Sequence, residues 1–134
     1  MKIVAKALLY DGAGRILLLR RSLTHPNYPH HYDFPGGEVE DGETHHIANQ
    51  REILEETSLV VPIGNVKLIY EKEISLDLTH IIHEIKLQEK QPAINLSWEH
   101  DGYIWLTLGE FLNSPVPEDP DDYYQTVLDY LHAM

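Results

Sequence analysis

The pattern of apolar and polar residues divides the chain into short strands separated by turns. Apolar residues dominate Lys2 to Tyr10, and a glycine-containing turn, Asp11 to Gly14, separates them from a second apolar run, Arg15 to Arg20. Two apolar runs joined by such a turn predict a β-hairpin. Partial alternation in Val66 to Ile74 and in Asp77 to Leu87 predicts two further strands.

One segment in the middle of the chain has the pattern of a helix. Thr44 is a candidate N-cap for a helix from about His45 to Thr57, with Ile47, Ile53 and Leu54 as apolar anchors. The other expected elements are a strand at Tyr32 to Phe34, a strand entered within Leu96 to Trp105, a short helix at Thr107 to Asn113 and a terminal helix at Tyr123 to His132. Two irregular segments are predicted to be a loop and a linker, namely Ser22 to His31 and Ser114 to Asp122.

This order of elements predicts one α/β (α+β) domain over residues 1–134, with a mixed β-sheet between helices. The absence of cysteine excludes a disulfide framework and a thiolate metal site. Because no segment has the pattern of a signal peptide or an apolar run of membrane length, we expect a soluble cytoplasmic protein with no membrane partner.

The charge of the chain further restricts the classes of partner that it can bind. The net charge is −12, with only ten lysines and arginines, which disfavours long nucleic acid because backbone phosphates are bound by basic patches. A small polyphosphate is compatible with this charge if metal ions bridge it to carboxylates. The oligomeric state stays open, with a homodimer among the alternatives.

The stretch from Gly36 to Leu59 has the densest charge, with seven acidic residues and one arginine in 24 positions. On the expected helix, Glu52 lies three residues from Glu55 and four from Glu56, so the three side chains share one face. Like charges at that spacing cost roughly 0.2–0.5 kcal/mol per pair. Two interpretations stay open: a solvated face moderated by Arg51, or carboxylates that converge on a hard divalent cation.

The same stretch resembles the Nudix box, the signature GX5EX7REUXEEXGU of the Nudix hydrolases, in which U is a bulky aliphatic residue. The matching positions are Gly37, Glu43, Arg51, Glu52, Ile53, Glu55, Glu56 and Leu59. Ser58 stands where the signature has its second glycine. A left-handed conformation there would cost a non-glycine residue about 1–2 kcal/mol, so either Ser58 accepts this strain or the turn after the helix is built differently. The resemblance, which extends to MutT-like members, implies a Nudix αβα sandwich.

The resemblance also implies roles for residues of the box. Glu55 and Glu56 would mainly bind metal, and Glu52 would be a metal ligand or the general base. Arg51 would orient the glutamates, so the catalytic candidates are Arg51, Glu52 and Glu55. The implied cofactor is Mg2+, with Mn2+ as the alternative.

Residues outside the helix complete the expected site. By resemblance, a backbone carbonyl of Gly36 or Gly37 would contribute to the metal shell. Glu99 lies in a segment like one that carries a further metal-binding glutamate, although a plain loop carboxylate is the alternative. The substrate-binding candidates are Arg20, Arg21 and Phe34. An arginine fork suits phosphate oxygens and an aromatic ring can stack on a base, but an exposed strand end and a core aromatic explain these residues equally well.

The implied activity is Mg-dependent hydrolysis of a nucleoside diphosphate linked to another group, X. Short MutT-like chains often act on (d)NTPs, which they split into a nucleoside monophosphate and pyrophosphate. ADP-ribose or another nucleotide sugar is the alternative substrate. A non-catalytic domain that senses a nucleotide, or a hydrolase of RNA 5′ ends, would belong to another functional class. The intact REUXEE core disfavours the first of these, and the acidic charge disfavours the second.

The nine histidines do not predict a separate metal site. Neighbouring side chains, as in His45 and His46, point in different directions on most backbones. His80 and His83 would lie on opposite faces of their expected strand, and no pair matches a zinc-binding motif of the HExxH type.

Overall fold

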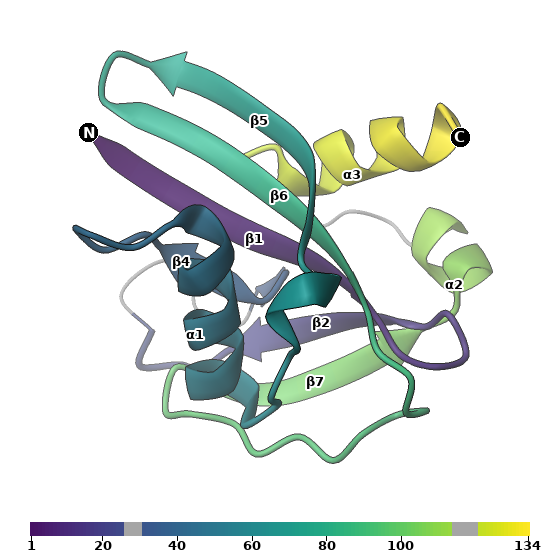
Figure 1. Ribbon diagram of the computed structural model, residues 1–134. Coiled ribbons are helices and arrows are strands. Elements are labelled where there is room, and N and C mark those ends of the chain that lie inside the picture. Colours follow the sequence, from purple (N-terminus) through teal and green to yellow (C-terminus); the bar gives the residue numbers. More distant parts are fainter. Residues whose placement is uncertain (26–30, 114–120) are drawn as a thin grey trace.

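The computed structural model describes residues 1–25, 31–113 and 121–134 (Figure 1). The elements in order are β1 (Lys2–Tyr10), β2 (Ile16–Arg21), β3 (Tyr32–Asp33), β4 (Gly36–Glu38), α1 (His45–Thr57), the 3-10 turn η1 (Ile63–Asn65), β5 (Lys67–Ser75), β6 (Leu78–Lys86), β7 (His100–Leu106), α2 (Leu108–Asn113) and α3 (Tyr123–His132). The ends of β1, α1 and α3 are those that the sequence predicts. Residues 26–30 and 114–120, which include His30 and most of the expected linker, lie outside the described residues.

Strand β1 is central to the sheet, whose order is β3-β2-β1-β6-β5, with β4 also paired to β1 and β7 to β2. Strands β1 and β6 run parallel from Lys2 opposite Leu78 to Tyr10 opposite Lys86, and the other pairs are antiparallel, so the sheet is mixed as predicted. The expected hairpin of β1 and β2 forms, but its strands pair only at Tyr10 and Ile16. Beyond that point β4 pairs with β1 instead.

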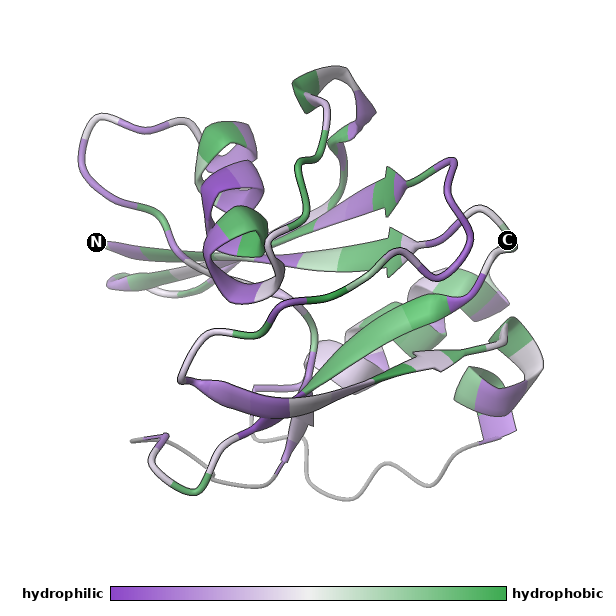
Figure 2. Cartoon of the chain, turned by 90° about the horizontal axis from the view of Figure 1, so that it is seen from below, coloured by the Kyte–Doolittle hydropathy of each residue, from purple (hydrophilic) through white to green (hydrophobic). Residues whose placement is uncertain are grey.

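Helices cover both faces of the sheet, with α1 on one side and α2 and α3 on the other (Figure 1). Each face has its own buried cluster. One contains Phe111 and Val127 from the C-terminal helices, and the other contains Ile53 from α1. Figure 2 shows that hydrophobic residues run along the central strands that supply both clusters. The predicted αβα sandwich is therefore confirmed, and no helix of the described residues is long and apolar enough to cross a membrane.

Local hydrogen bonds define both ends of α1. The Thr44 side chain accepts a hydrogen bond from the Ile47 backbone N–H at 3.3 Å, as expected of an N-cap. Ser58 ends the helix in the left-handed conformation, with φ at 64°, and its N–H donates to the Leu54 carbonyl at 2.9 Å. Ser58 thus takes the geometry usually given to glycine, and its hydroxyl also donates to the Asn95 carbonyl at 3.3 Å.

The face of α1 that meets the sheet differs from the predicted one. Ile53 is buried, but Ile47 and Leu54 are 47% and 48% exposed, so the prediction of these two as packing anchors was wrong. The helix buries Ala48 and Asn49 in their place. Asn49 donates from Nδ2 to the Ala5 carbonyl of β1 at 2.6 Å. A small residue and a hydrogen-bonded amide let the helix approach the sheet backbone more closely than two large apolar residues would.

Replacing Gly36 by alanine is expected to lower the free energy of unfolding by about 3 kcal/mol. Gly36 has φ at 134°, and an added Cβ would lie 2.1 Å from the Ala5 carbonyl oxygen. Gly14→Ala is the matched control, because Gly14 has φ at 79° but no atom within 4 Å of the added Cβ. That control should cost about 1–2 kcal/mol from conformation alone. Urea denaturation measures both values, and equal losses would contradict a steric role for the Gly36 contact.

Candidate active site

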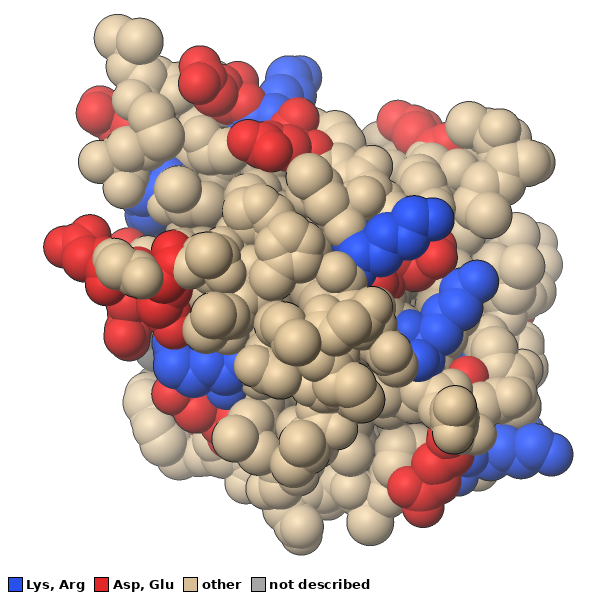
Figure 3. Space-filling model, viewed as in Figure 1, with Lys and Arg blue, Asp and Glu red and all other residues tan. Residues whose placement is uncertain are grey.

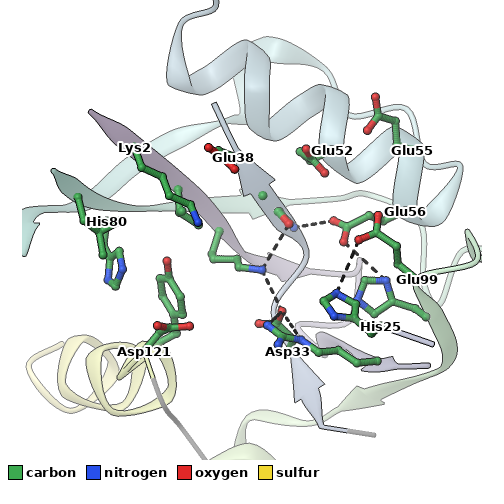
Figure 4. A pocket seen from close by; sticks show the side chains of 18 residues that line it. Lys2, His25, Asp33, Glu38, Glu52, Glu55, Glu56, His80, Glu99 and Asp121 are labelled. Atoms are coloured by element: carbon green, nitrogen blue, oxygen red, sulfur yellow. Dashed lines mark hydrogen bonds and ion pairs between the residues drawn. The ribbon is translucent and has the colours of Figure 1, made fainter. Parts of the chain in front are cut away.

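A pocket of about 570 Å³ lies between α1, the first strands and the start of α3. Figure 4 shows its two sides: acidic residues of α1, β4 and the loop before β7 face Lys2, His80 and Asp121 across the floor. Figure 3 shows acidic side chains gathered over the segment that joins β4 to α1, next to this helix. The pocket therefore has one strongly acidic wall and an opposite wall of mixed character.

Glu56 is the most deeply buried carboxylate of the acidic wall, with 5% of its surface exposed. Its Oε1 accepts a hydrogen bond from the Gly36 N–H at 2.8 Å. Burial raises the pKa of Glu56 to about 8, although the charge of Lys6 and the Gly36 N–H act in the opposite direction. His100 lies 3.6 Å from Oε2 through Nδ1, and burial lowers its pKa to about 4, so it approaches Glu56 as a neutral ring.

Glu52 lies one turn earlier on α1 and is half-buried. Burial raises its pKa, while the neighbouring Arg51 opposes that shift. The backbone of Gly37 is packed against this carboxylate: a Cβ on Gly37 would lie 2.7–2.9 Å from the carboxyl atoms of Glu52. A side chain at position 37 would displace the Glu52 carboxylate, because Gly37 of β4 and Glu52 of α1 lie in direct contact.

Arg51 connects the acidic residues of the wall to one another. Its guanidinium donates to both oxygens of Glu43, at 2.8 and 2.9 Å, to Glu52 at 3.1 Å and to Glu55 at 3.3 Å. It also donates to the Glu38 carbonyl at 3.1 Å. The hydrogen bonds from Arg51 are the largest cause of the low pKa of Glu43, about 2. Arg51 thus offsets the repulsion along α1 and limits where the side chains of Glu52 and Glu55 can lie.

The remaining two predicted metal-binding glutamates lie at the rim of the pocket. Glu55 has a side chain that is 57% exposed, and it contacts Arg51. Glu99 comes from the loop before β7, and its Oε2 lies 3.6 Å from Nε2 of His25. Figure 4 shows the Glu99 and Glu56 side chains on the same side of the pocket. The structure therefore brings Glu52, Glu55, Glu56 and Glu99 to one pocket that Gly36 and Gly37 also line.

A buried ion-pair network, which the sequence analysis missed, forms the floor of the pocket. Lys6 of β1 donates to Oδ2 of Asp33 at 2.9 Å, and Arg21 donates to the same oxygen at 2.8 Å. Burial alone would lower the pKa of Lys6, but Asp33 and Glu56 outweigh it, so the pKa is raised and the amine is charged. The available signal was Lys6, a lysine in the middle of β1 between apolar neighbours.

Only one of the three predicted substrate-binding residues lines the pocket. Arg21 lines the pocket through its contact with Asp33. Arg20 lies outside the pocket lining and pairs with Asp101 at 2.7 Å near the surface, because successive strand residues point to opposite faces. Phe34 is 1% exposed and packs against Phe111 and Tyr124 in the core, also outside the lining.

The donor atoms of the acidic wall suit a hard divalent cation. Glu52, Glu56 and Glu99 offer carboxylate oxygens, and the Gly36–Gly37 backbone offers carbonyl oxygens. Mg2+ and Mn2+ prefer such oxygen ligands. A cation here would also compensate Glu56, whose raised pKa reflects a buried carboxylate with too little positive charge around it.

Comparisons with known proteins give one family and one fold. A sequence model described as the NUDIX domain matches residues 2–127. The structure of a MutT protein from Methanosarcina mazei Go1 is 25% identical, covers 98% of this chain and 95% of its own, and has a TM-score of 0.72. A bifunctional NMN adenylyltransferase/ADP ribose pyrophosphatase from Francisella tularensis, solved with AMP and a manganese ion, is 22% identical. It covers 98% of this chain and 41% of its own, with a TM-score of 0.75.

A third similar structure is an Ap4A hydrolase binary complex from C. elegans, which is 20% identical, covers 98% of this chain and 99% of its own, and has a TM-score of 0.63. A search of the curated proteins gave no match. These similar structures share the fold of this chain, and two of them are named for activities on different nucleotide compounds, ADP-ribose and Ap4A.

Proposed function

The chain belongs to the NUDIX domain family and is a Nudix hydrolase, and on this premise we propose that it hydrolyses a (d)NTP to a nucleoside monophosphate and pyrophosphate, with Mg2+ or Mn2+ as cofactor. The observation that carries the proposal is the convergence of Glu52, Glu56 and Glu99 with the Gly36–Gly37 backbone on one pocket. The similarity to a MutT protein over nearly the whole of both chains supports a nucleoside triphosphate as the substrate.

The charges explain why such a pocket would need a cofactor. An acidic wall repels polyphosphate, and a divalent cation held there would supply positive charge for the phosphates and activate a water for attack. Glu55, Glu56 and Glu99 are the side chains we assign to hold the cation, together with a carbonyl of Gly36 or Gly37. Arg51 positions Glu52 and Glu55 through the contacts described above.

We assign the general base to Glu52. Glu56 is deeply buried and accepts the Gly36 N–H, whereas Glu52 is only half-buried and faces the pocket. In the reaction a water oxygen attacks phosphorus, Glu52 takes a proton from that water, and the phosphoanhydride bond breaks with pyrophosphate leaving. The raised pKa of Glu52 favours its acceptance of a proton at neutral pH. Lys2, Lys6 and Arg21 are the cations of the described residues that line the pocket and could contact phosphate oxygens.

ADP-ribose is the second candidate substrate. It is favoured by the fold similarity to the Francisella tularensis protein, which includes an ADP ribose pyrophosphatase and was solved with AMP and manganese. Both candidates contain a pyrophosphate that the same carboxylates would bind through the metal. They differ in the group that leaves, so product analysis distinguishes them.

Incubation with a nucleotide panel and Mg2+ is expected to convert (d)NTPs to monophosphate and pyrophosphate, with EDTA abolishing turnover because the acidic wall then repels the substrate. Separate assays for pyrophosphate, inorganic phosphate and monophosphate identify the bond that breaks. If AMP and ribose phosphate form from ADP-ribose while (d)NTPs are stable, the second candidate replaces the first. Nucleotide binding without turnover of any panel member would contradict both and indicate a sensor domain.

A further inference from the structure

Three histidines converge at the first turn of α1, outside the nucleotide pocket. His45 and His46 begin the helix, and His83 comes from β6, where it is fully buried. Nδ1 of His45 lies 2.8 Å from Nε2 of His83, and one ring nitrogen of each residue lies within 4.8 Å of the other two. The expectation that His45 and His46 point in different directions is thus wrong, because the first helical turn lies over β6 and both rings reach His83.

Within the described residues, the ring nitrogens of this cluster form only some of the hydrogen bonds that they could form. His45 and His83 share one hydrogen bond, and Nδ1 of His83 is buried with no hydrogen-bond partner. Burial and the neighbouring rings hold the pKa of His83 at about 4, and burial also lowers that of His45. These rings are therefore neutral at physiological pH, and the neutral imidazole is the form that binds metal.

We propose that His45, His46 and His83 form a second metal site, which binds Zn2+ and is distinct from the carboxylate site. Three imidazoles suit Zn2+, whereas Mg2+ prefers oxygen ligands, so the two sites would select different ions. Glu71 of β5 exerts a negative charge on His45 that favours a cation here, and a water would complete a four-coordinate shell.

The geometry requires only small side-chain movements. Zn–N bonds of about 2.0–2.1 Å in a tetrahedral shell place ligand nitrogens about 3.3 Å apart. The distance between Nδ1 of His45 and Nε2 of His83 would increase slightly from 2.8 Å. The ring nitrogen of His46, which lies within 4.8 Å of the other two, would move closer to them. His46 is partly exposed, so its ring has room to turn, while buried His83 provides a fixed ligand.

Such a site would be structural and not catalytic. It would tie the first turn of α1 to β6, and the same helix carries Glu52 and Glu56 two to three turns later. The bound ion would stabilise the folded chain by mass action, because the unfolded chain does not hold the three rings together. The inference is independent of the substrate assigned to the pocket.

The test is equilibrium dialysis of the full chain against Zn2+ in saturating Mg2+, which occupies the carboxylate site. The wild type is expected to bind one Zn2+, and His46→Gln should weaken that binding about tenfold or more. His132→Gln, an exposed histidine at the end of α3, is the matched control and should bind as the wild type does. Glu52→Gln should also retain the zinc, which separates this site from the carboxylates.

The melting temperature distinguishes the loss of a zinc ligand from misfolding of the variant. Zn2+ should raise the melting temperature of the wild type and of His132→Gln but not that of His46→Gln, with circular dichroism verifying that all three are folded. Long-range 1H–15N spectra should show zinc-dependent shifts of three imidazoles. No zinc bound by the wild type under Mg2+, equal affinity in His46→Gln, or loss of zinc in Glu52→Gln would each overturn the proposal.

Discussion

Replacing Glu52 by glutamine is expected to lower kcat on the best substrate by about 10²–10⁴-fold, the range of a lost general base. The amide keeps the shape of the side chain and can accept the hydrogen bond from Arg51 at 3.1 Å, but it cannot take the proton of the attacking water. Glu56→Gln should also reduce turnover, through weaker metal binding. Steady-state kinetics over a range of Mg2+ concentrations measures both variants.

Kinetics in saturating Mg2+ distinguish a lost general base from a lost metal ligand. Excess Mg2+ should restore part of the activity of Glu56→Gln, because a lost ligand weakens binding, whereas it should not restore Glu52→Gln if that residue is the base. Glu73→Gln is the matched control, since Glu73 is an exposed carboxylate of β5 outside the pocket lining. Wild-type turnover in both Glu52→Gln and Glu56→Gln would exclude the acidic face of α1 as the site of chemistry.

Replacing Asp33 by asparagine is expected to lower the free energy of unfolding by about 3–5 kcal/mol, the usual cost of removing one partner from a buried ion pair. Asp33 accepts from both Lys6 and Arg21 on one oxygen, and all three side chains are nearly buried. Without its charge, two cations remain next to each other in a poorly solvated site. Urea denaturation at neutral pH measures the loss.

Asp101→Asn provides a matched comparison, because its partner is the adjacent arginine of β2, Arg20, in an ion pair near the surface. Exposed pairs contribute about 0–1 kcal/mol, so this variant should be nearly neutral. Equal losses in Asp33→Asn and Asp101→Asn would contradict the assigned difference in burial.

The pH dependence of unfolding gives an independent check on Asp33. Burial alone would raise its pKa, but Lys6 and Arg21 outweigh burial and lower it. A lowered folded-state pKa adds stability above the unfolded-state value and loses it as the pH falls through the folded-state value. The wild type should therefore lose stability below about pH 4, and Asp33→Asn should lose less over that range. The same acid sensitivity in both proteins would contradict the assignment.

Sequence pattern located the elements that depend on neighbouring residues. Strand β1 and helices α1 and α3 have the predicted ends, because side-chain periodicity and capping act over a few positions. Errors arose where a tertiary partner mattered. The sequence analysis predicted no strand at Gly36–Glu38, yet this segment forms β4 because it pairs with β1. Ile47 and Leu54 have the period of a buried face but remain exposed, because Ala48 and Asn49 face β1 instead.

By itself the sequence determined the acidic face of α1, since Glu52, Glu55 and Glu56 lie within four residues and the helical repeat fixes their common side. Arg51 was likewise placed among them by spacing alone. Only the tertiary structure decided which groups meet that face. Gly36 reaches Glu56 across 20 residues, and Lys6 reaches Asp33 across 27. The convergence of His45 and His46 on His83 spans 38 residues. Such contacts depend on strand order and register, which bring together segments that no local periodicity relates.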